Sequence, residues 1–368
     1  MDGVDASIIQ SDGETKYKVI INKYFKYSDN IYKDLIKLRD KIKTSRDLKK
    51  FSKEAIDLEK KITLFHAKAA NDIIKKSKVN VDFIGFHGQT IYHNAREKIS
   101  KQLGDGKLLS KITKKTVVYD FRQNDLKNGG EGAPLTPIFH KMLAKKLNLK
   151  NVTFINIGGI INATTICDDG YFEAQDVGPG MCLIDKWIRI NSKKKYDDKG
   201  RIAKAGKINK KILNKAINNF ITYHNKYVHK NGFEPSYDIK DFEDSFNILH
   251  PKFLKGLSLK DGAATLTEFT VRILDEVLQI VREGVSSDHD FILCGGGRKN
   301  DFLVEKIRRS WITTKRAILI DKYGIDGDFI ESQAFAYLAI RSYLKIPISF
   351  PTTTGCSEPC TGGVIIKN

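Results

Sequence analysis

Apolar residues recur along the chain with two different periods, which predict helices and strands in alternation. The segment 31–78 has apolar positions at helical spacing with lysines between them, which predicts helix. Further helices are predicted at 137–146, 207–230, 260–283 and 328–344. Strands, or strand–glycine–helix units, are predicted at 81–90, 115–125, 152–166, 172–190, 290–309 and 316–325. This alternation of strands and helices indicates an α/β protein.

The first predicted strand lies directly at the amino terminus. "MDGVDASIIQ" opens on a turn at Asp2-Gly3 and runs directly into a short predicted strand, Ala6–Ile9. The chain therefore begins inside a structural element rather than ahead of one.

Length and composition set limits on the class of protein. The 368 residues, 41% of them hydrophobic, suffice for two domains with sizeable cores. There is no apolar run of about 18 residues and no visible signal peptide, so we expect no membrane span. An odd number of cysteines, five, without close CxxC pairs or interleaved histidines argues against a disulfide framework or a zinc site, and we therefore expect a protein of the reducing cytoplasm.

The net charge of +19 raises the alternative of a nucleic-acid-binding protein. Lysines are dense at 38–53 and 189–215, but they do not alternate with aromatic residues as a base-stacking surface requires. We therefore interpret the charge as solvated surface that also steers small anionic substrates, and we expect no nucleic-acid partner.

Two glycine turns are candidates for holding a phosphate or a flat ring. In "LCGGGRKND", Gly295, Gly296 and Gly297 follow an apolar strand and let backbone N–H groups approach an anion. In "NIGGIINATTI", Gly158 and Gly159 leave similar room. Both turns also suit a purely structural role, as a packed turn and an ordinary hairpin.

Several polar residues at predicted element ends are candidates for catalysis or binding. Asp176 in "AQDVGPG" suits a general base or a helix cap. His87 and Gln89 end an apolar strand, where ligand clefts form in α/β sheets, although a core histidine is the alternative. Arg122 suits a carboxylate clamp or a structural ion pair, and Glu331 suits a cleft or the start of a helix.

The order of the motifs carries more information than any one of them. "GFHGQTIYH", "QLGDGKLL", "VVYDFRQNDLKNGGEGAPLTPIFH", "NIGGIINATTI", "DVGPGMCLIDKWI", "AATLTEFT", "LCGGGRKND", "YGIDGDFIESQAFAYLA" and "PTTTGCSEPCTGGVI" follow one another along the chain. In this order and spacing the sequence resembles the anhydro-N-acetylmuramic acid kinases over essentially its whole length.

The resemblance implies a fold and a reaction. The implied fold is the two-domain actin-like ATPase (ribonuclease H-like) fold, with a cleft between domains at 1–133 plus 350–368 and at 134–349. The implied enzyme hydrolyses the 1,6-anhydro ring of 1,6-anhydro-N-acetylmuramic acid and phosphorylates O6 with ATP and Mg²⁺. The product is N-acetylmuramic acid 6-phosphate, in peptidoglycan recycling and amino-sugar metabolism, and a homodimer is a possible assembly.

The resemblance also implies residue roles. Asp176 matches the catalytic base and Glu331 an acidic position facing the cleft. The nucleotide-contacting positions are Asp2, Gly3, Asp5, Gly158, Gly159, Gly295, Gly296 and Gly297. The sugar-side positions are His87, Gln89, Gln102, Asp105 and Arg122. No residue is assigned to the metal.

The chain departs from the family pattern at its start. "DGVDA" matches the tail of a motif of the type GxMSGTSxDGVDAA, so the first strand of the amino-terminal sheet and most of the first phosphate loop are expected to be missing. The neighbouring strands would then expose unpaired edges. Three explanations stay open: a start upstream of Met1, a decaying gene, or a functional short form.

Other departures bear on sugar recognition more than on fold. Gln123 and Asn124 replace two arginines, Tyr92 replaces a third, Met181 replaces an asparagine, and 234–247 lacks the Lys-Ser-Thr-Gly-Arg core of a family loop. The alternative function is a non-catalytic nucleotide- or sugar-binding relic of the same fold, and a nucleic-acid-binding module ranks third.

Overall fold

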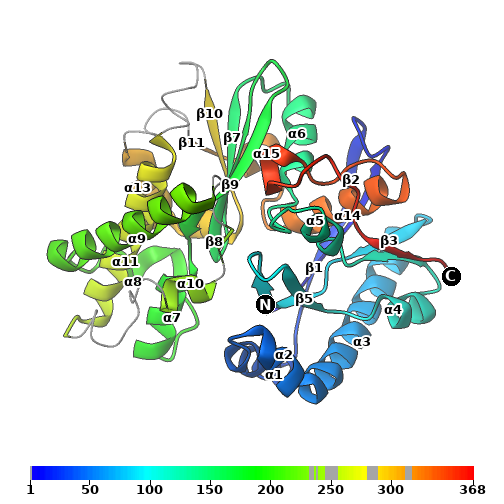
Figure 1. Ribbon diagram of the computed structural model, residues 1–368, viewed down its shortest axis with the longest axis horizontal. Helices are drawn as coiled ribbons and strands as arrows, with labels where there is room; N and C mark the ends of the chain where they lie inside the picture. Colours follow the sequence, from blue (N-terminus) through cyan, green and yellow to red (C-terminus); the bar gives the residue numbers. More distant parts are fainter. Residues whose placement is uncertain (1, 232–235, 238, 245–255, 280–288, 311–316) are drawn as a thin grey trace. The chain divides into compact units, whose positions relative to one another are not determined.

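Two α/β units make up the chain in the computed structural model (Figure 1). The structure describes all residues except 1, 232–235, 238, 245–255, 280–288 and 311–316. Unit 1 comprises residues 1–148 and 328–368, and unit 2 comprises 149–327. The α/β class predicted from the sequence is confirmed, while the narrower actin-like assignment stays a prediction. None of the described helices combines the length and the apolar character that a membrane span requires.

The division between the units differs from the boundaries drawn on the sequence at 133/134 and 349/350. Two helices account for the difference, because they lie in unit 1 and pack against each other: α6 (Pro137–Lys146) and α14 (Ile330–Tyr343). α14 also packs against β1 (Gly3–Ser11) and β3 (Phe83–Phe86), so it belongs with the amino-terminal strands.

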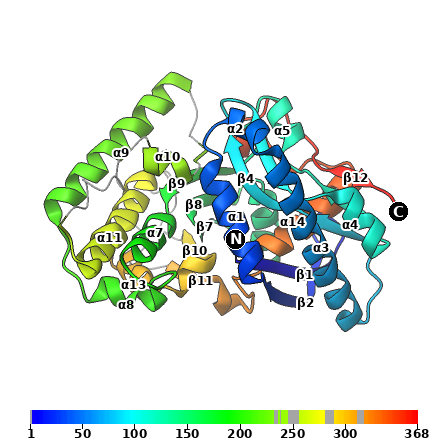
Figure 2. The same cartoon turned by 90° about the horizontal axis from the view of Figure 1, so that it is seen from below.

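Unit 1 holds three small sheets rather than one. β1 pairs antiparallel with β2 (Tyr17–Lys26) (Figure 2), and β3 lies parallel to β6 (Thr116–Tyr119), which pairs on its other side with β12 (Val364–Ile366). A separate hairpin joins β4 to β5. The other elements of the unit are α1 (Asp29–Lys41), α2 (Ser45–Lys50), α3 (Ser52–Ser77), β4 (Gln89–Asn94), β5 (Ile99–Leu103), α4 (Gly106–Thr113), α5 (Gln123–Lys127) and α15 (Pro351–Thr354).

The segment predicted as helical at 31–78 is three helices instead. Ile42 leaves the helical conformation at the end of α1, and Thr44 then starts a new helix, because its backbone N–H donates to the Asp47 carboxylate at 2.9 Å. The apolar positions still do what their spacing predicts: Leu58 and Ile62 of α3 are buried in one core with Leu35 of α1.

Unit 2 is built on a five-stranded mixed sheet in the order β11-β10-β7-β8-β9 (Figure 1). β10 runs parallel to both β7 and β11, and β7, β8 and β9 follow one another antiparallel. The strands are β7 (Val152–Ile157), β8 (Ile160–Ile166), β9 (Phe172–Pro179), β10 (Asp290–Cys294) and β11 (Ala317–Leu319).

Helices that carry one large apolar core accompany this sheet. The helices of unit 2 are α7 (Cys182–Asn191), η1 (Asp198–Gly200), α8 (Arg201–Lys204), α9 (Lys210–Asn231), α10 (Ile239–Asp244), α11 (Leu259–Val277), η2 (Gly296–Lys299), α13 (Asp301–Arg309) and η3 (Ile320–Tyr323). The last residues of the helix predicted at 260–283 and the first residue of the strand predicted at 316–325 lie outside the described residues.

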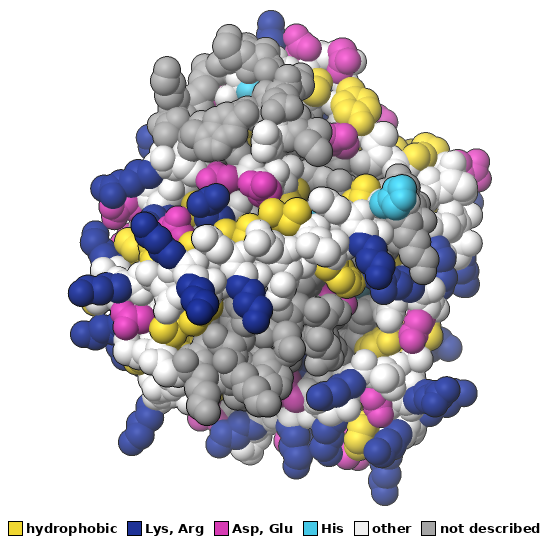
Figure 3. Space-filling view, turned by 60° about the vertical axis from the view of Figure 1, so that its left-hand side comes forward, with side chains coloured by type: hydrophobic (Ala, Val, Ile, Leu, Met, Phe, Trp, Pro, Cys, Tyr) yellow, Lys and Arg dark blue, Asp and Glu magenta, His cyan; other side chains and the backbone are white. Residues whose placement is uncertain are grey.

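Charged side chains are mixed on the surface. On the face seen in Figure 3, Lys and Arg side chains are spread out with Asp and Glu between them. The expectation that no nucleic acid binds stays a prediction.

Gly85 sets how closely α14 lies to β3. A Cβ atom at Gly85 would lie 2.6 Å from the backbone oxygen of Phe335 and 3.0 Å from the Cβ of Ala339. Backbone cannot move aside as a flexible side chain can, so only glycine permits this approach.

We predict that Gly85→Ala lowers the free energy of unfolding by about 1–3 kcal/mol, because the added methyl group pushes α14 away from the sheet. Urea unfolding measures the change. Gly296→Ala is the matched control, since no described atom lies within 4 Å of a Cβ there. Equal midpoints for the two variants would contradict this account of the α14 contact.

Candidate active site

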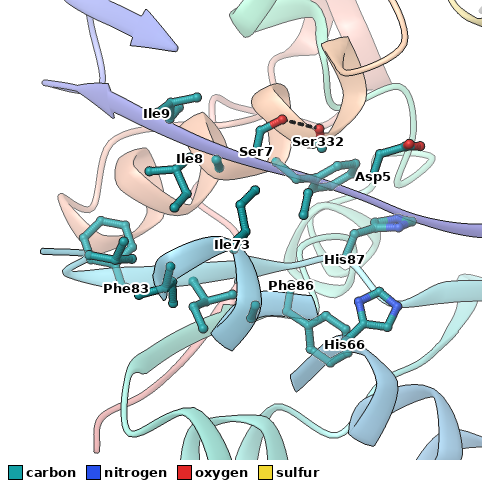
Figure 4. Close-up of a pocket in the computed structure, with 18 of the residues that line it drawn as sticks. Asp5, Ser7, Ile8, Ile9, His66, Ile73, Phe83, Phe86, His87 and Ser332 are labelled. Carbon is teal, nitrogen blue, oxygen red and sulfur yellow. Dashed lines mark hydrogen bonds between the residues drawn. The ribbon is translucent and has the colours of Figure 1, made fainter. Parts of the chain in front are cut away.

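A cavity of about 1210 Å³ in unit 1 collects several of the residues singled out in the sequence (Figure 4). Its lining includes residues of β1, β3 and α3, and residues along α14 from Glu331 to Tyr343. Among its lining residues are three predicted nucleotide-contacting residues, two predicted sugar-side residues and one predicted catalytic residue: Asp2, Gly3, Asp5, His87, Gln89 and Glu331. Segments more than 300 residues apart in the sequence thus contribute to one site.

Carboxylates gather at one part of this cavity. Asp5 comes from β1 and Glu331 from the first turn of α14, with Asp2 and Asp328 nearby. The Asp5 side chain is accessible to solvent, yet desolvation by the surrounding protein, followed by the negative charge of Glu331, raises the pKa of Asp5 to about 6. Crowded acidic groups of this kind are stabilised when a cation binds among them.

His87 and Arg122 form a bonded pair at the end of β3. The Nη2 of Arg122 lies 3.0 Å from Nε2 of His87, and Nδ1 of His87 lies 3.1 Å from the Gly88 carbonyl oxygen. Because the guanidinium only donates and the carbonyl only accepts, the neutral His87 ring carries its proton on Nδ1. Burial, followed by the charge of Arg122, lowers the pKa of His87 to about 3, so the ring stays neutral at physiological pH.

The remaining sugar-side residues lie along the β4–β5 hairpin and at the start of α4. Gln89 donates to the Tyr27 hydroxyl at 3.3 Å, and Gln102 donates to Thr90 at 3.1 Å across the hairpin. Asp105 caps α4 by accepting from the Leu108 N–H at 3.0 Å. The sugar-binding roles of these three residues stay predictions.

Four polar side chains in or beside the cavity were not predicted from the sequence. The Tyr27 hydroxyl lies 2.9 Å from Nε2 of His66, and burial lowers the pKa of that histidine to about 4. Ser332 bonds to Ser7 of β1 at 2.6 Å, which ties α14 to the hairpin. His66 lies within a long helical pattern in the sequence, where nothing distinguishes it from any other polar position of the helix.

The residues that depart from the family pattern make structural contacts. Gln123 donates to the Ser100 carbonyl at 2.6 Å, and Asn124 donates to the Thr361 carbonyl at 2.7 Å. Tyr92 is buried, and its hydroxyl donates to Glu97 at 2.7 Å. Met181 packs against the core of unit 2 at the start of α7. These substitutions are accommodated by local bonding and packing.

The two glycine turns of unit 2 lie side by side. Gly158 and Gly159 follow β7, and Gly295 follows β10, the parallel neighbour of β7, with Cys294 opposite Asn156. Parallel strands end at the same edge of a sheet, which brings both turns together. Gly295 has φ +78°, and a Cβ at Gly297 would collide with the Ile157 side chain.

Gly296 is different from its two neighbours. Its φ is not positive, and no described atom lies within 4 Å of where a Cβ would stand. Neither backbone conformation nor packing within the described part of unit 2 therefore requires glycine here. The open space above Gly296 is available to a ligand.

Arg298 holds the Gly295–Gly297 turn in place through a bond to the Gly295 carbonyl. The sequence did not indicate this role. The guanidinium is 5% exposed and grips Asp321 with two bonds of 2.7 and 2.9 Å, while Nη1 donates to the Gly295 carbonyl at 3.1 Å. Bidentate arginine–carboxylate pairs hold a fixed geometry. Arg298 is thus a positioning residue for Gly295–Gly297.

Asp176 lies on β9 and is 7% exposed. Its Oδ2 accepts from the Tyr237 N–H at 3.0 Å and lies 3.5 Å from the Ser236 hydroxyl. Asn162 stands opposite Asp176 in the β8–β9 register, and its buried amide oxygen has no hydrogen-bond partner among the described residues. The loop 234–247, of which 234–235, 238 and 245–247 lie outside the described residues, thus contributes a backbone donor to Asp176.

One group of potential metal ligands lies elsewhere in unit 1. The carboxylate of Asp125 and the sulfurs of Cys356 and Cys360 are buried and within 4.8 Å of one another. Asp125 accepts from Gly132 N–H and from the Thr354 hydroxyl at 2.6 Å each, and burial raises the pKa of Cys360 to about 11. We interpret the group as a hydrogen-bonded cluster of neutral thiols that anchors the carboxy-terminal segment.

The family model and the curated relatives match this chain over its full length, and they carry the same family name. The family described as "Anhydro-N-acetylmuramic acid kinase" matches residues 1–368. Proteins of that name from Pelagibacter ubique and Agrobacterium fabrum are 50% and 35% identical to this chain, and each match covers 100% of the chain and 96% of the relative.

Among solved structures, the activator of the 2-hydroxyisocaproyl-CoA dehydratase from Clostridium difficile with bound ADPNP matches with a TM-score of 0.40 and 11% identity. This match covers 92% of the chain and 94% of that structure. At this similarity the match does not bear on function.

We predict that Glu331→Gln lowers the pKa of Asp5 below about 6, because it removes the strongest neighbouring negative charge, while desolvation still keeps the pKa above the ordinary value of 3.8. Carboxyl-carbon NMR across a pH titration measures the pKa. The control, Asp328→Asn, removes a weaker neighbour and is expected to lower it less. An Asp5 pKa that Glu331→Gln leaves unchanged would show that the two carboxylates do not interact.

Proposed function

Since the chain belongs to the anhydro-N-acetylmuramic acid kinase family, we propose that it transfers the γ-phosphoryl group of ATP to O6 of 1,6-anhydro-N-acetylmuramic acid. Water adds to C1 as the bond between C1 and O6 breaks, and O6 takes the phosphoryl group. The products are ADP and N-acetylmuramic acid 6-phosphate. This reaction is a step of peptidoglycan recycling.

The observation that carries the nucleotide part of the proposal is the open space at Gly296. Two neighbouring glycines are explained by φ or by packing, and this one is not. Backbone N–H groups at such a turn approach phosphate oxygens closely because no side chain stands in the way. We assign Gly295–Gly297 and the adjacent Gly158-Gly159 turn to ATP, with Arg298 keeping the first turn in shape.

Asp176 is proposed as the general base for the attacking water. Donation by the Tyr237 N–H to Oδ2 orients the carboxylate, which suits a base that must accept a proton in one direction. The neighbouring Asn162 amide oxygen is an acceptor for the same water or for a sugar hydroxyl.

The acidic group in the cavity of unit 1 is proposed to attract a divalent cation. Carboxylate oxygens are the ligands that Mg²⁺ prefers. Desolvation, followed by the negative charges of Glu331, Asp2 and Asp328, raises the pKa of Asp5 to about 6. Asp5, Asp2 and Glu331 are proposed to hold the ion. When bound, Mg²⁺ neutralises phosphate charge during phosphoryl transfer.

His87 and Arg122 are proposed to act on the sugar side. The Arg122 guanidinium is held by His87 and by the Gly132 carbonyl at 2.7 Å, so its orientation is fixed before substrate arrives. A fixed guanidinium is suited to the lactyl carboxylate of the sugar, which is the substrate's own negative charge.

We predict that Asp176→Asn lowers kcat by about 10²- to 10⁴-fold, because the amide cannot take a proton from water. A coupled assay for ADP release with 1,6-anhydro-N-acetylmuramic acid measures kcat, and thermal unfolding checks that the fold is kept. Glu173→Gln, on the same strand, is the matched control and keeps wild-type turnover. Turnover that survives Asp176→Asn would overturn the assigned mechanism.

We predict that Gly296→Ala weakens ADP binding by about tenfold or more while leaving stability unchanged, because its methyl group enters space that only a ligand uses. Calorimetric titration with ADP measures the dissociation constant. Gly297→Ala is the comparison variant. Its methyl group would clash with the Ile157 side chain, so we expect it to lower the stability of the protein. If the Gly296→Ala protein bound ADP with wild-type affinity, the assignment of the nucleotide to this turn would be contradicted.

A further inference from the structure

A buried carboxylate and two buried thiols meet in unit 1, outside the lining of the cavity described above. Asp125 of α5 is 1% exposed, Cys356 is 2% exposed and Cys360 is 7% exposed. Their ligating atoms, one carboxylate oxygen and two sulfurs, all lie within 4.8 Å of one another. Asp125 precedes Cys360 by 235 residues, so the fold assembles this group. The absence of close CxxC pairs from the sequence therefore does not bear on it.

The carboxylate of Asp125 has hydrogen-bond donors but no cationic partner in the described part of the chain. It accepts from the Gly132 N–H and from the Thr354 hydroxyl, each at 2.6 Å, and Sγ of Cys360 lies 3.9 Å away. A charge that is removed from water is normally paired with an opposite charge or bound to a metal ion. This carboxylate is therefore a favourable ligand for a cation.

The three ligand atoms select the kind of ion. Thiolate sulfur is a soft ligand that Mg²⁺ and Ca²⁺ do not favour, whereas Zn²⁺ accepts sulfur and carboxylate oxygen in one tetrahedral site. Tetrahedral bonds of about 2.0–2.3 Å put ligand atoms about 3.3–3.8 Å apart, so the separations in the group shorten by about 1.5 Å at most when it closes on an ion. The Ser349 hydroxyl, 3.0 Å from Sγ of Cys360, provides an oxygen for the fourth position.

The exchange of two protons for one zinc ion leaves the net charge of the group unchanged. With neutral thiols, the group carries the single negative charge of Asp125. When Zn²⁺ binds, both S–H bonds break, the two protons pass to solvent and two Zn–S bonds form. Two thiolates, one carboxylate and one Zn²⁺ again sum to a single negative charge. Loading the group therefore buries no additional net charge, which keeps the cost of desolvation low.

The position of the group suits a structural ion. Residues 357–359, between the two cysteines, are exposed, so only a short surface loop separates the sulfurs from solvent. Cys360 pairs with Ser349 through the backbone and belongs to the carboxy-terminal segment, whereas Asp125 belongs to α5. An ion bound by both cysteines and Asp125 ties this segment to α5.

We propose that Asp125, Cys356 and Cys360 form a structural zinc site that binds one Zn²⁺ per chain and fixes the carboxy-terminal segment to α5. The site is distinct from the acidic group at Asp5 and Glu331, which offers oxygen ligands only. The inference does not rest on the kinase reaction, because metal binding is measured without nucleotide or sugar.

Cobalt reports on the site, because Co²⁺ takes the place of Zn²⁺ and absorbs light by charge transfer from bound thiolate. The full chain, reduced and freed of metal by a chelator, is titrated with Co²⁺ without oxygen and in excess Mg²⁺. We expect one equivalent of Co²⁺ to give the thiolate band and Zn²⁺ to displace it. Cys356→Ser and Cys360→Ser are each expected to weaken Co²⁺ binding by about 100-fold or more. Cys167→Ser, in unit 2, is the matched control and keeps the band.

Two further measurements complete the test. Because an ion that binds only the folded state stabilises it, Zn²⁺ is expected to raise the thermal midpoint of the wild-type and Cys167→Ser chains but not that of the other two variants. X-ray absorption at the zinc edge uses the wild-type chain alone, and we expect two sulfur atoms at about 2.3 Å with oxygen atoms at about 2.0–2.2 Å. Fewer than two sulfur ligands, no thiolate band at saturating Co²⁺, or wild-type Co²⁺ affinity after Cys356→Ser or Cys360→Ser would refute the proposal.

Discussion

The close seating of α14 on β1 and β3 is the contact on which unit 1 depends. It is possible only because Gly85 lets the helix backbone approach the sheet, and Ser332 adds a bond to Ser7 of β1. α14 lies near the carboxy terminus of the sequence, and its first turn places Glu331 at the cavity. One packing contact thus fixes both the architecture of the amino-terminal strands and the position of an acidic residue.

Electrostatics follows from that packing. Desolvation raises the pKa of Asp5, and the negative charge of Glu331, which the helix holds at the same cavity, raises it further. At the end of β3, the neutral and half-buried His87 ring accepts a hydrogen bond from Arg122 and holds that guanidinium in one orientation. The cavity therefore has an acidic region, and the Arg122 guanidinium is held in place by His87, one of the residues that line it.

Unit 2 places its two glycine turns at one edge of its sheet. Parallel pairing of β7 with β10 ends both strands at one edge, and the glycine turns that follow lie next to each other. Arg298 then fixes the second turn through Asp321 and the Gly295 carbonyl. A buried charge in this place is stable because its donors are engaged by a carboxylate and a carbonyl oxygen.

The sequence by itself determined the α/β class, the glycine turns and the family, because apolar periodicity and ordered motifs are local properties. It also singled out Asp176, His87 and Glu331 as candidate site residues, but it did not indicate β2, Arg298 or the link between Tyr27 and His66. The break between α1 and α2 depends on the helix cap at Thr44. The sequence did not reveal this break, because apolar residues continue at helical spacing across it. Only tertiary structure decided that α14 joins the amino-terminal strands and that Asp5 and Glu331 share a cavity, because contacts across some 300 residues leave no periodic trace in the sequence.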